Sequence, residues 1–213
     1  MMRKATTLAV LGIALILGLT SLAGAQDSKP APPTIVAFGS DSVERGTTRV
    51  GFWNTKKDHG VGQFAIDYGR PVWKKDYEDT AKFDAMTKGH VYRLGSNFWT
   101  TLDSDMPLNI AGTTIPAGLW YLGLQRSADG AMWSLVFIDP MKARADHIDA
   151  SEINRAPVAY KAVMTTESAT EMKDKLTIDL VFQKATPKDV TLRIGWGKLL
   201  LSAPVQVSVP SAD

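Results

Sequence analysis

The stretch KLTIDLVFQK, residues 175–184, decides the fold class because its side chains alternate between apolar and polar. Successive side chains of a β-strand point to opposite faces, so this pattern predicts a strand with one buried face. Residues 189–197, DVTLRIGWG, and residues 203–209, APVQVSV, repeat the alternation. The last part of the chain therefore predicts strands rather than helices.

Similar runs recur toward the amino terminus, separated by Gly, Pro, Asn and Asp. A hairpin bend is expected at Asp129-Gly130, and short helices are expected after Asp79 and at Asp139-Pro140. The further expected strands are 48–54, 62–68, 91–101, 118–126, 131–139 and 157–166. This spacing predicts a mainly β domain, an antiparallel β-sandwich or open barrel of roughly nine strands with one or two short helices.

The first 25 residues predict an export signal. Arg3 and Lys4 precede an apolar run over residues 8–19, and Ala23-Gly24-Ala25 forms a small-residue cleavage site. This run is shorter than the roughly 20 residues that cross a bilayer as a helix. We therefore expect a signal peptide at 1–25, a leader with a first edge strand at 26–47 and a single β-rich domain at 48–213. The mature protein is expected to be periplasmic or secreted, with no stable membrane span.

The net positive charge of the chain comes from the two basic residues of this signal. The full sequence has 24 Lys+Arg against 22 Asp+Glu, and removing the two basic residues of the signal leaves 22 against 22. A neutral mature chain gives no reason to expect nucleic-acid binding through a basic surface. Cysteine is absent, which excludes disulfides, thiolate metal ligands and cysteine nucleophiles.

Motifs for the common chemistries are missing from the sequence. It contains no phosphate-binding Gly-rich loop, dinucleotide fingerprint, Gly-x-Ser-x-Gly elbow or His-Glu-x-x-His helix. The histidines His59, His90 and His147 are isolated, and Asp103 with Asp105 is more typical of a solvated turn than of a cation site. We therefore expect no catalytic residues, no metal and no cofactor.

The segment YRLGSNFWTT, residues 92–101, is the first candidate ligand site. A continuous strand would place Arg93, Asn97 and Trp99 on one face. Arginine offers donors for a carboxylate or phosphate, asparagine offers a donor and an acceptor, and tryptophan offers a stacking surface. The alternative interpretation is structural, with Arg93 paired to a carboxylate such as Asp67 and Asn97 satisfying loop backbone groups.

A second candidate group lies in the loop after the strand at 62–68. It contains Arg70 and Trp73, and a loop tryptophan can contact a sugar or peptide ligand, although it more often covers one end of a sandwich core. The chain has six tryptophans, which divide into two sets by their neighbours. The expected core members are Trp120, Trp133 and Trp196, and the three that could be exposed are Trp53, Trp73 and Trp99.

Three blocks of sequence resemble a known family. They are IDYGRP at 66–71, YRLGSN at 92–97 and IPAGLWYL at 115–122. In order and spacing they resemble a bacterial family of exported proteins known as domain of unknown function twenty-nine eleven, over residues 48–209. The chain departs from the family pattern at Gly69 and Tyr92, where the family has Ser and Trp, and along residues 141–155. The resemblance implies export and a mainly β domain, and it implies no reaction.

Three functions fit these residues. We favour an exported, non-catalytic binding module for a small polar ligand, a glycan or an envelope protein partner. Its candidate ligand-binding residues are Arg93, Asn97, Trp99, Arg70 and Trp73. One alternative is a hydrolase or isomerase in which Asp103 or Asp67 acts as base beside Arg93. The other is a purely structural envelope domain with a flat apolar patch or an open sheet edge.

Overall fold

The computed structural model describes residues 35–37, 39 and 43–209. The expected signal peptide and most of the expected leader lie outside this part of the chain. Residues 43–209 belong to one compact unit. Its described residues are mainly β, as the alternating sequence predicts.

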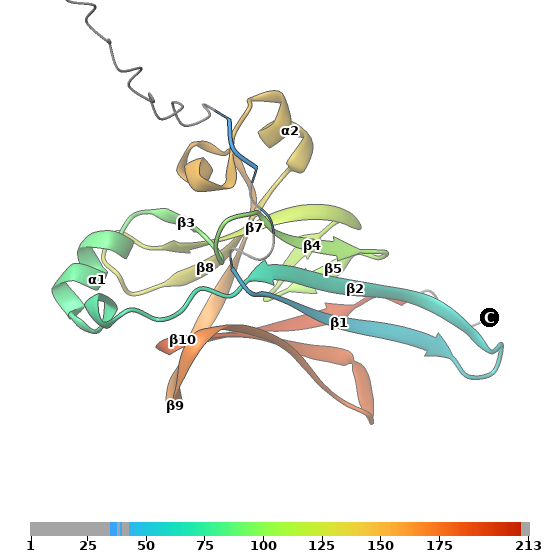
Figure 1. The fold of residues 1–213 in the computed structure, drawn as a ribbon. Coiled ribbons are helices and arrows are strands. Elements are labelled where there is room, and N and C mark those ends of the chain that lie inside the picture. The colour runs from blue at the N-terminus through green and yellow to red at the C-terminus, as the bar shows by residue number, and fades with distance from the viewer. Residues whose placement is uncertain (1–34, 38, 40–42, 210–213) are drawn as a thin grey trace, which may run out of the picture. The chain divides into compact units, whose positions relative to one another are not determined.

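Ten strands form one antiparallel sheet within residues 43–209 (Figure 1). They are β1 (Arg45–Asn54), β2 (His59–Gly69), β3 (Val91–Arg93), β4 (Thr100–Ser104), β5 (Leu108–Ile110), β6 (Thr113–Ile115), β7 (Gly118–Arg126), β8 (Trp133–Ile138), β9 (Val158–Gln183) and β10 (Thr186–Val207). The order in the sheet is β1-β2-β4-β7-β8-β9-β10-β5-β6, with β3 paired to β7. The sheet is not closed into a barrel, and the prediction of a mainly β, antiparallel fold is confirmed.

The long strand β9 turns this sheet into two layers. Its first residues pair with β8, and the rest of the strand pairs with β10. The first layer therefore contains β1, β2, β4, β7 and β8, while β10 and the second part of β9 lie against β1 and β2 from the other side (Figure 1). Phe64 and Ile66 on β2 share one buried core with Ile178 on β9 and Ile194 on β10.

Tyr68 ties the two layers together by hydrogen bonds. It is buried on β2, and its hydroxyl accepts from the Ile178 backbone N–H on β9 at 3.0 Å. The same hydroxyl lies 3.4 Å from the Ile178 carbonyl, to which it donates. One phenol therefore satisfies both backbone groups of a core residue in the opposite layer.

Several predicted strand boundaries are wrong. The separate strands expected at 157–166 and 175–184 are one strand, β9, and those at 189–197 and 203–209 both belong to β10. In β9 the mostly polar residues 167–174 do not alternate with apolar ones, so the pattern did not indicate that the strand continues. Glu167 nevertheless pairs with Leu200, and Ser168 pairs with Leu199. The short strands β5 and β6 were not expected.

The prediction of one continuous strand at 91–101 is also wrong. β3 ends at Arg93 and β4 begins at Thr100, with a loop between them. Gly95 and Asn97 have φ values of 101° and 63°, in the left-handed region that breaks an extended strand. The single face expected for Arg93, Asn97 and Trp99 therefore does not form.

Both helix predictions are confirmed. Asp79 caps α1 (Thr80–Thr87) by accepting from two backbone N–H groups, and Asp139 caps α2 (Pro140–Ala145) by accepting from the Met141 N–H. Two further short helices, η2 (Lys75–Glu78) and η3 (Ala150–Arg155), were not expected. No helix within the described residues has the length and apolar character needed to cross a membrane.

Candidate functional site

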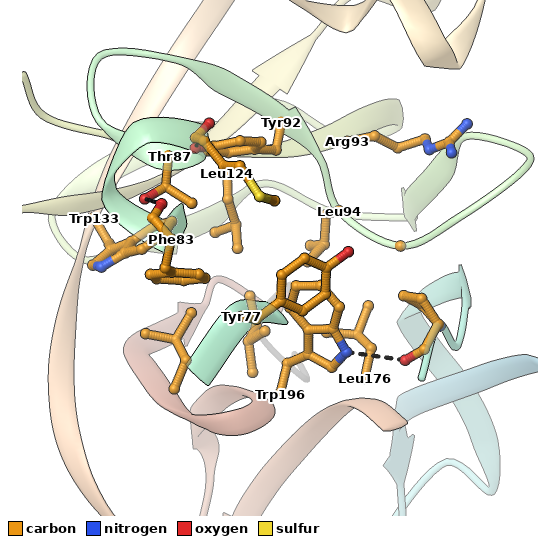
Figure 2. Close-up of a pocket in the computed structure, with 15 residues that line it drawn as sticks. Tyr77, Phe83, Thr87, Tyr92, Arg93, Leu94, Leu124, Trp133, Leu176 and Trp196 are labelled. Carbon is orange, nitrogen blue, oxygen red and sulfur yellow. Dashed lines mark hydrogen bonds between the residues drawn. The ribbon is translucent and has the colours of Figure 1, made fainter. Parts of the chain in front are cut away.

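A pocket of about 200 Å³ lies inside the domain, between the two layers and beside α1 (Figure 2). Its floor is made of buried side chains from both layers and from the loop after β3. They are Leu94, Leu124 on β7, Trp133 on β8, Leu176 on β9 and Ile194 on β10. The floor therefore offers apolar surface, because Figure 2 shows the Trp133 indole nitrogen pointing away from the pocket.

The rim of the pocket is largely aromatic. Tyr77 on η2, Phe83 on α1, Tyr92 on β3 and Trp196 on β10 line it and keep part of their surface in solvent. Met86 on α1 also lines it and is 45% exposed. Solvent-exposed lining residues on η2 and α1 indicate that the pocket opens on this side.

Trp73 does not line the pocket, but it packs against two aromatic residues of the rim. Its ring lies 5.1 Å from Trp196 and 5.3 Å from Tyr77, in edge-to-face arrangements that favour aromatic pairs. It also covers Gly197, where φ is 60° and any Cβ would collide with the indole. The aromatic rim is thus part of a continuous cluster that joins η2 to β10.

Most polar groups around the pocket already have partners. The Trp196 indole N–H donates to the Pro71 carbonyl at 3.0 Å, and the Tyr92 hydroxyl donates to the Met86 carbonyl at 2.6 Å. Burial raises the pKa of Tyr92, so its phenol stays protonated. The Thr87 hydroxyl donates to the backbone carbonyl of Phe83. Among the described residues, the Tyr77 hydroxyl has no hydrogen-bond partner, which makes it the free polar group of the rim.

Arg126 holds α1 against the β7–β8 hairpin. Its guanidinium donates to the Asp84 carboxylate at 2.6 Å and to the Thr87 hydroxyl at 2.8 Å. It also lies over the rings of Phe83 and Trp133, 5.8 and 5.4 Å from their centroids. One arginine thus fixes the helix that forms one side of the pocket.

Asp84 makes the attachment of α1 dependent on pH. Hydrogen bonds from Lys88 and then Arg126 lower the pKa of Asp84 below its usual value of 3.8. A carboxylate with a depressed folded-state pKa stabilises the fold above its unfolded pKa, and this contribution is lost as the pH falls through the folded pKa. We expect Asp84→Asn to lower the Tm at about pH 7 and to have little effect at about pH 2.

Thermal unfolding at both pH values tests this expectation. Asp76→Asn is the matched control, because Asp76 makes an exposed pair with Lys82 beside the same helix. Exposed pairs contribute little, so this variant should leave the Tm nearly unchanged at both pH values. If Asp84→Asn lowers the Tm equally at both pH values, the charge of Asp84 does not hold α1 in place.

The structure brings two of the five candidate residues together. Arg93 donates from Nη1 to the Asn97 backbone carbonyl at 2.8 Å. The Arg93 stem borders the pocket, but Figure 2 shows its guanidinium pointing away from the aromatic rings. Its expected pairing with Asp67 is wrong, because Asp67 is bound by Arg45 and Thr47.

The other three candidates lie in separate surroundings. Trp99 stacks on Tyr121, with 4.4 Å between ring centroids and an interplanar angle of 4°. Arg70 pairs with Glu44 and donates to the Leu176 carbonyl at 3.1 Å. Trp73 lies behind the pocket rim. The five residues therefore do not form one site, and their roles as ligand contacts stay predictions.

The burial of the tryptophans differs in part from what the sequence predicts. Trp133 is buried as expected, whereas Trp120 and Trp196 are only partly buried. Trp53 is 59% exposed, in agreement with expectation. Trp73 and Trp99 are partly buried, because each packs against another aromatic ring.

Comparison with known proteins agrees with the three sequence blocks. Residues 53–205 match the model of the family described as protein of unknown function DUF2911. The chain belongs to this family. No curated protein and no solved structure matches this DUF2911 chain. The matched region includes the whole lining of the pocket.

Sequence reasoning placed Trp133 and Trp196 in the core but did not identify the pocket of this DUF2911 chain. Tyr77, Phe83, Trp133 and Trp196 come from four separate elements, and only the fold brings them together. The one available signal was the helical spacing of Phe83 and Met86 after Asp79, which predicts that one side of α1 faces the domain. Within the described residues, no group of three or more His, Cys, Asp or Glu is placed to hold a metal ion.

Proposed function

We propose that this DUF2911 chain is an exported, non-catalytic binding module that holds a small, mainly apolar molecule with a ring. The observation that carries the proposal is the aromatic pocket of about 200 Å³ between the layers. An apolar cavity of roughly 150 Å³ is large enough to bind benzene in another protein. Export is supported by the arrangement of charged, apolar and small residues at 1–25.

The chemistry of the lining favours an apolar ring over a polar ligand. The Trp196 and Tyr92 donors are already used by backbone carbonyls, so they are not free to replace the water around a polar molecule. Burying a polar group without a partner costs free energy. The free Tyr77 hydroxyl can orient a single polar substituent at the rim. This proposal replaces the small polar ligand expected from the sequence with a mainly apolar one.

The position of the carboxylates favours binding over catalysis. The hydrolase or isomerase alternative needs Asp67 or Asp103 beside Arg93 and a substrate. Asp67 is engaged by Arg45 and Thr47, and Asp103 is exposed on β4. Neither carboxylate lines the pocket. The pocket itself supports a binding role over a purely structural one.

Thermal unfolding with small probes tests the proposed function. We expect indole and naphthalene to raise the Tm of the wild-type domain, and glucose and acetate to leave it unchanged. Specific binding stabilises the native state, by about 2.7 kcal/mol at a ligand concentration of 100 Kd. The Leu124→Phe variant, which adds atoms to the pocket floor, is expected to lose the shift.

Leu119→Phe is the control for this variant. Leu119 lies on the same strand, β7, but is 40% exposed and does not line the pocket. It should keep the full response to indole and naphthalene. A shift with glucose or acetate alone, or an undiminished shift in Leu124→Phe, would reject the interlayer pocket as the binding site.

A further inference from the structure

A second hollow lies at the β1–β2 hairpin, apart from the interlayer pocket. It has a volume of about 480 Å³ and is lined by residues of β1, β2 and the segment just after β4. No residue is shared with the pocket between the layers. Its lining includes Trp53, three glycines, Gln63 and Asp105.

Trp53 presents an open aromatic surface to this hollow. It is 59% exposed, more than any other described aromatic residue. It pairs with Gly60 across the hairpin, directly after a register shift at Phe52. Its Cε3 and Cζ3 atoms lie 3.8 Å from the position of a Cβ on Gly60, so the indole rests beside a residue with no side chain. Exposing a tryptophan in this way costs hydrophobic free energy, which a stacked ligand would recover.

Glycine keeps the space beside the indole open. Gly51 lies two residues before Trp53 on the same face of β1, opposite Gln63 on β2. A Cβ at this position would meet no atom within 4 Å. The space beside the Trp53 indole is therefore open, because residue 51 has no side chain and no neighbouring side chain fills the position.

Two polar side chains border the hollow and have hydrogen-bonding capacity to spare. Oδ2 of Asp105 accepts from the Gln63 backbone N–H at 3.1 Å, and the Asp105 N–H donates to the Gln63 carbonyl at 3.0 Å. These bonds fix the carboxylate in place. Asp105 and Gln63 are both exposed, and within the described part of the chain neither Oδ1 of Asp105 nor the Gln63 side-chain amide has a hydrogen-bond partner.

We propose that this hollow binds one pyranose unit of a neutral β-linked glycan chain. A pyranose with equatorial hydroxyls has an apolar C–H face that stacks on Trp53, and a rim of hydroxyls. One hydroxyl donates to Asp105 Oδ1, and a second exchanges hydrogen bonds with the Gln63 amide. The site is open and shallow, so it suits an internal unit of a chain that continues in both directions.

The same groups argue against other occupants. The Asp105 carboxylate repels the phosphates of a nucleic acid. A flat apolar protein surface would bury Gln63 and Asp105 without partners, which costs free energy. This proposal is independent of the proposed function, because it concerns different residues and a different ligand class.

Isothermal titration with cellohexaose and chitohexaose tests the proposal on the mature domain. We expect wild-type protein to bind at least one of the two hexasaccharides, and Trp53→Ala to weaken that binding by about tenfold or more. Trp53→Tyr should retain part of the affinity, because it keeps a ring. Asp105→Asn should weaken binding by several-fold while leaving the response to indole unchanged.

Phe98→Ala is the matched control, since Phe98 is an exposed aromatic residue, 40% accessible, outside the hollow. It should bind the hexasaccharide like the wild type. The proposal is overturned if neither hexasaccharide binds, if Trp53→Ala binds as tightly as the wild type, or if Trp53→Ala only abolishes self-association measured by sedimentation. Indole binding in Trp53→Ala shows separately whether the interlayer pocket is intact.

Discussion

Trp133→Ala is expected to lower the free energy of unfolding by about 3–5 kcal/mol, the range typical of a large aromatic residue removed from a core. Trp133 is only 5% exposed at the start of β8. Its ring lies 6.3 Å from Phe83 and 6.5 Å from Tyr92, beneath the guanidinium of Arg126. The change removes the pocket floor and the surface on which α1 is held. Urea unfolding followed by circular dichroism measures the effect.

Trp53→Ala is the natural control, because the same side chain is removed from an exposed position on β1. Its expected effect is within about 0.5 kcal/mol. Indole should raise the Tm of Trp133→Ala, because the new cavity has the shape of the lost ring. Similar losses in the two variants would contradict the assignment of Trp133 to the core and Trp53 to the surface.

Tyr68→Phe is expected to lower the free energy of unfolding by about 1–3 kcal/mol. The change removes one oxygen and leaves the N–H and carbonyl of Ile178 without the partner that the tyrosine supplies across the layers. Ile178 is fully buried, so water does not replace the lost bonds. The effect is measured by chemical unfolding of both proteins under identical conditions.

Tyr160→Phe provides the comparison for this prediction. Tyr160 is partly buried against Trp120, and its hydroxyl has no hydrogen-bond partner within residues 43–209. Removing that hydroxyl should change the stability little. If Tyr68→Phe proves as mild as Tyr160→Phe, the hydrogen bonds of Tyr68 do not hold the layers together.

Much of the fold can be predicted from the sequence because strand and cap signals are local. The alternation at 175–184 identifies part of β9, and Asp79 and Asp139 identify the starts of two helices. The errors arise where backbone geometry overrides the side-chain pattern. Gly95 and Asn97 break the expected strand at 91–101, since both adopt positive φ. The mostly polar residues 167–174 continue β9, and Glu167, Ser168 and Lys173 among them pair with β10.

The candidate site was far less predictable than the fold. Periodicity shows which face of a strand is buried, but not which residues meet across two layers. Trp196 meets Tyr77 only because β10 passes behind η2, and Arg126 meets Asp84 only because β7 passes beside α1. Trp53 is different, since its polar surroundings at 54–60 already indicated exposure.

The most direct test of the interlayer pocket is an NMR experiment with indole and the methyl-labelled domain. We expect intermolecular nuclear Overhauser effects between indole protons and the methyl groups of Leu124, Leu176 and Ile194, which lie on three different strands. These signals should disappear in Leu124→Phe and persist in Leu119→Phe. Contacts confined to surface methyl groups such as Leu119, or no contacts at saturating indole, would contradict the account of this domain as a binder of apolar rings.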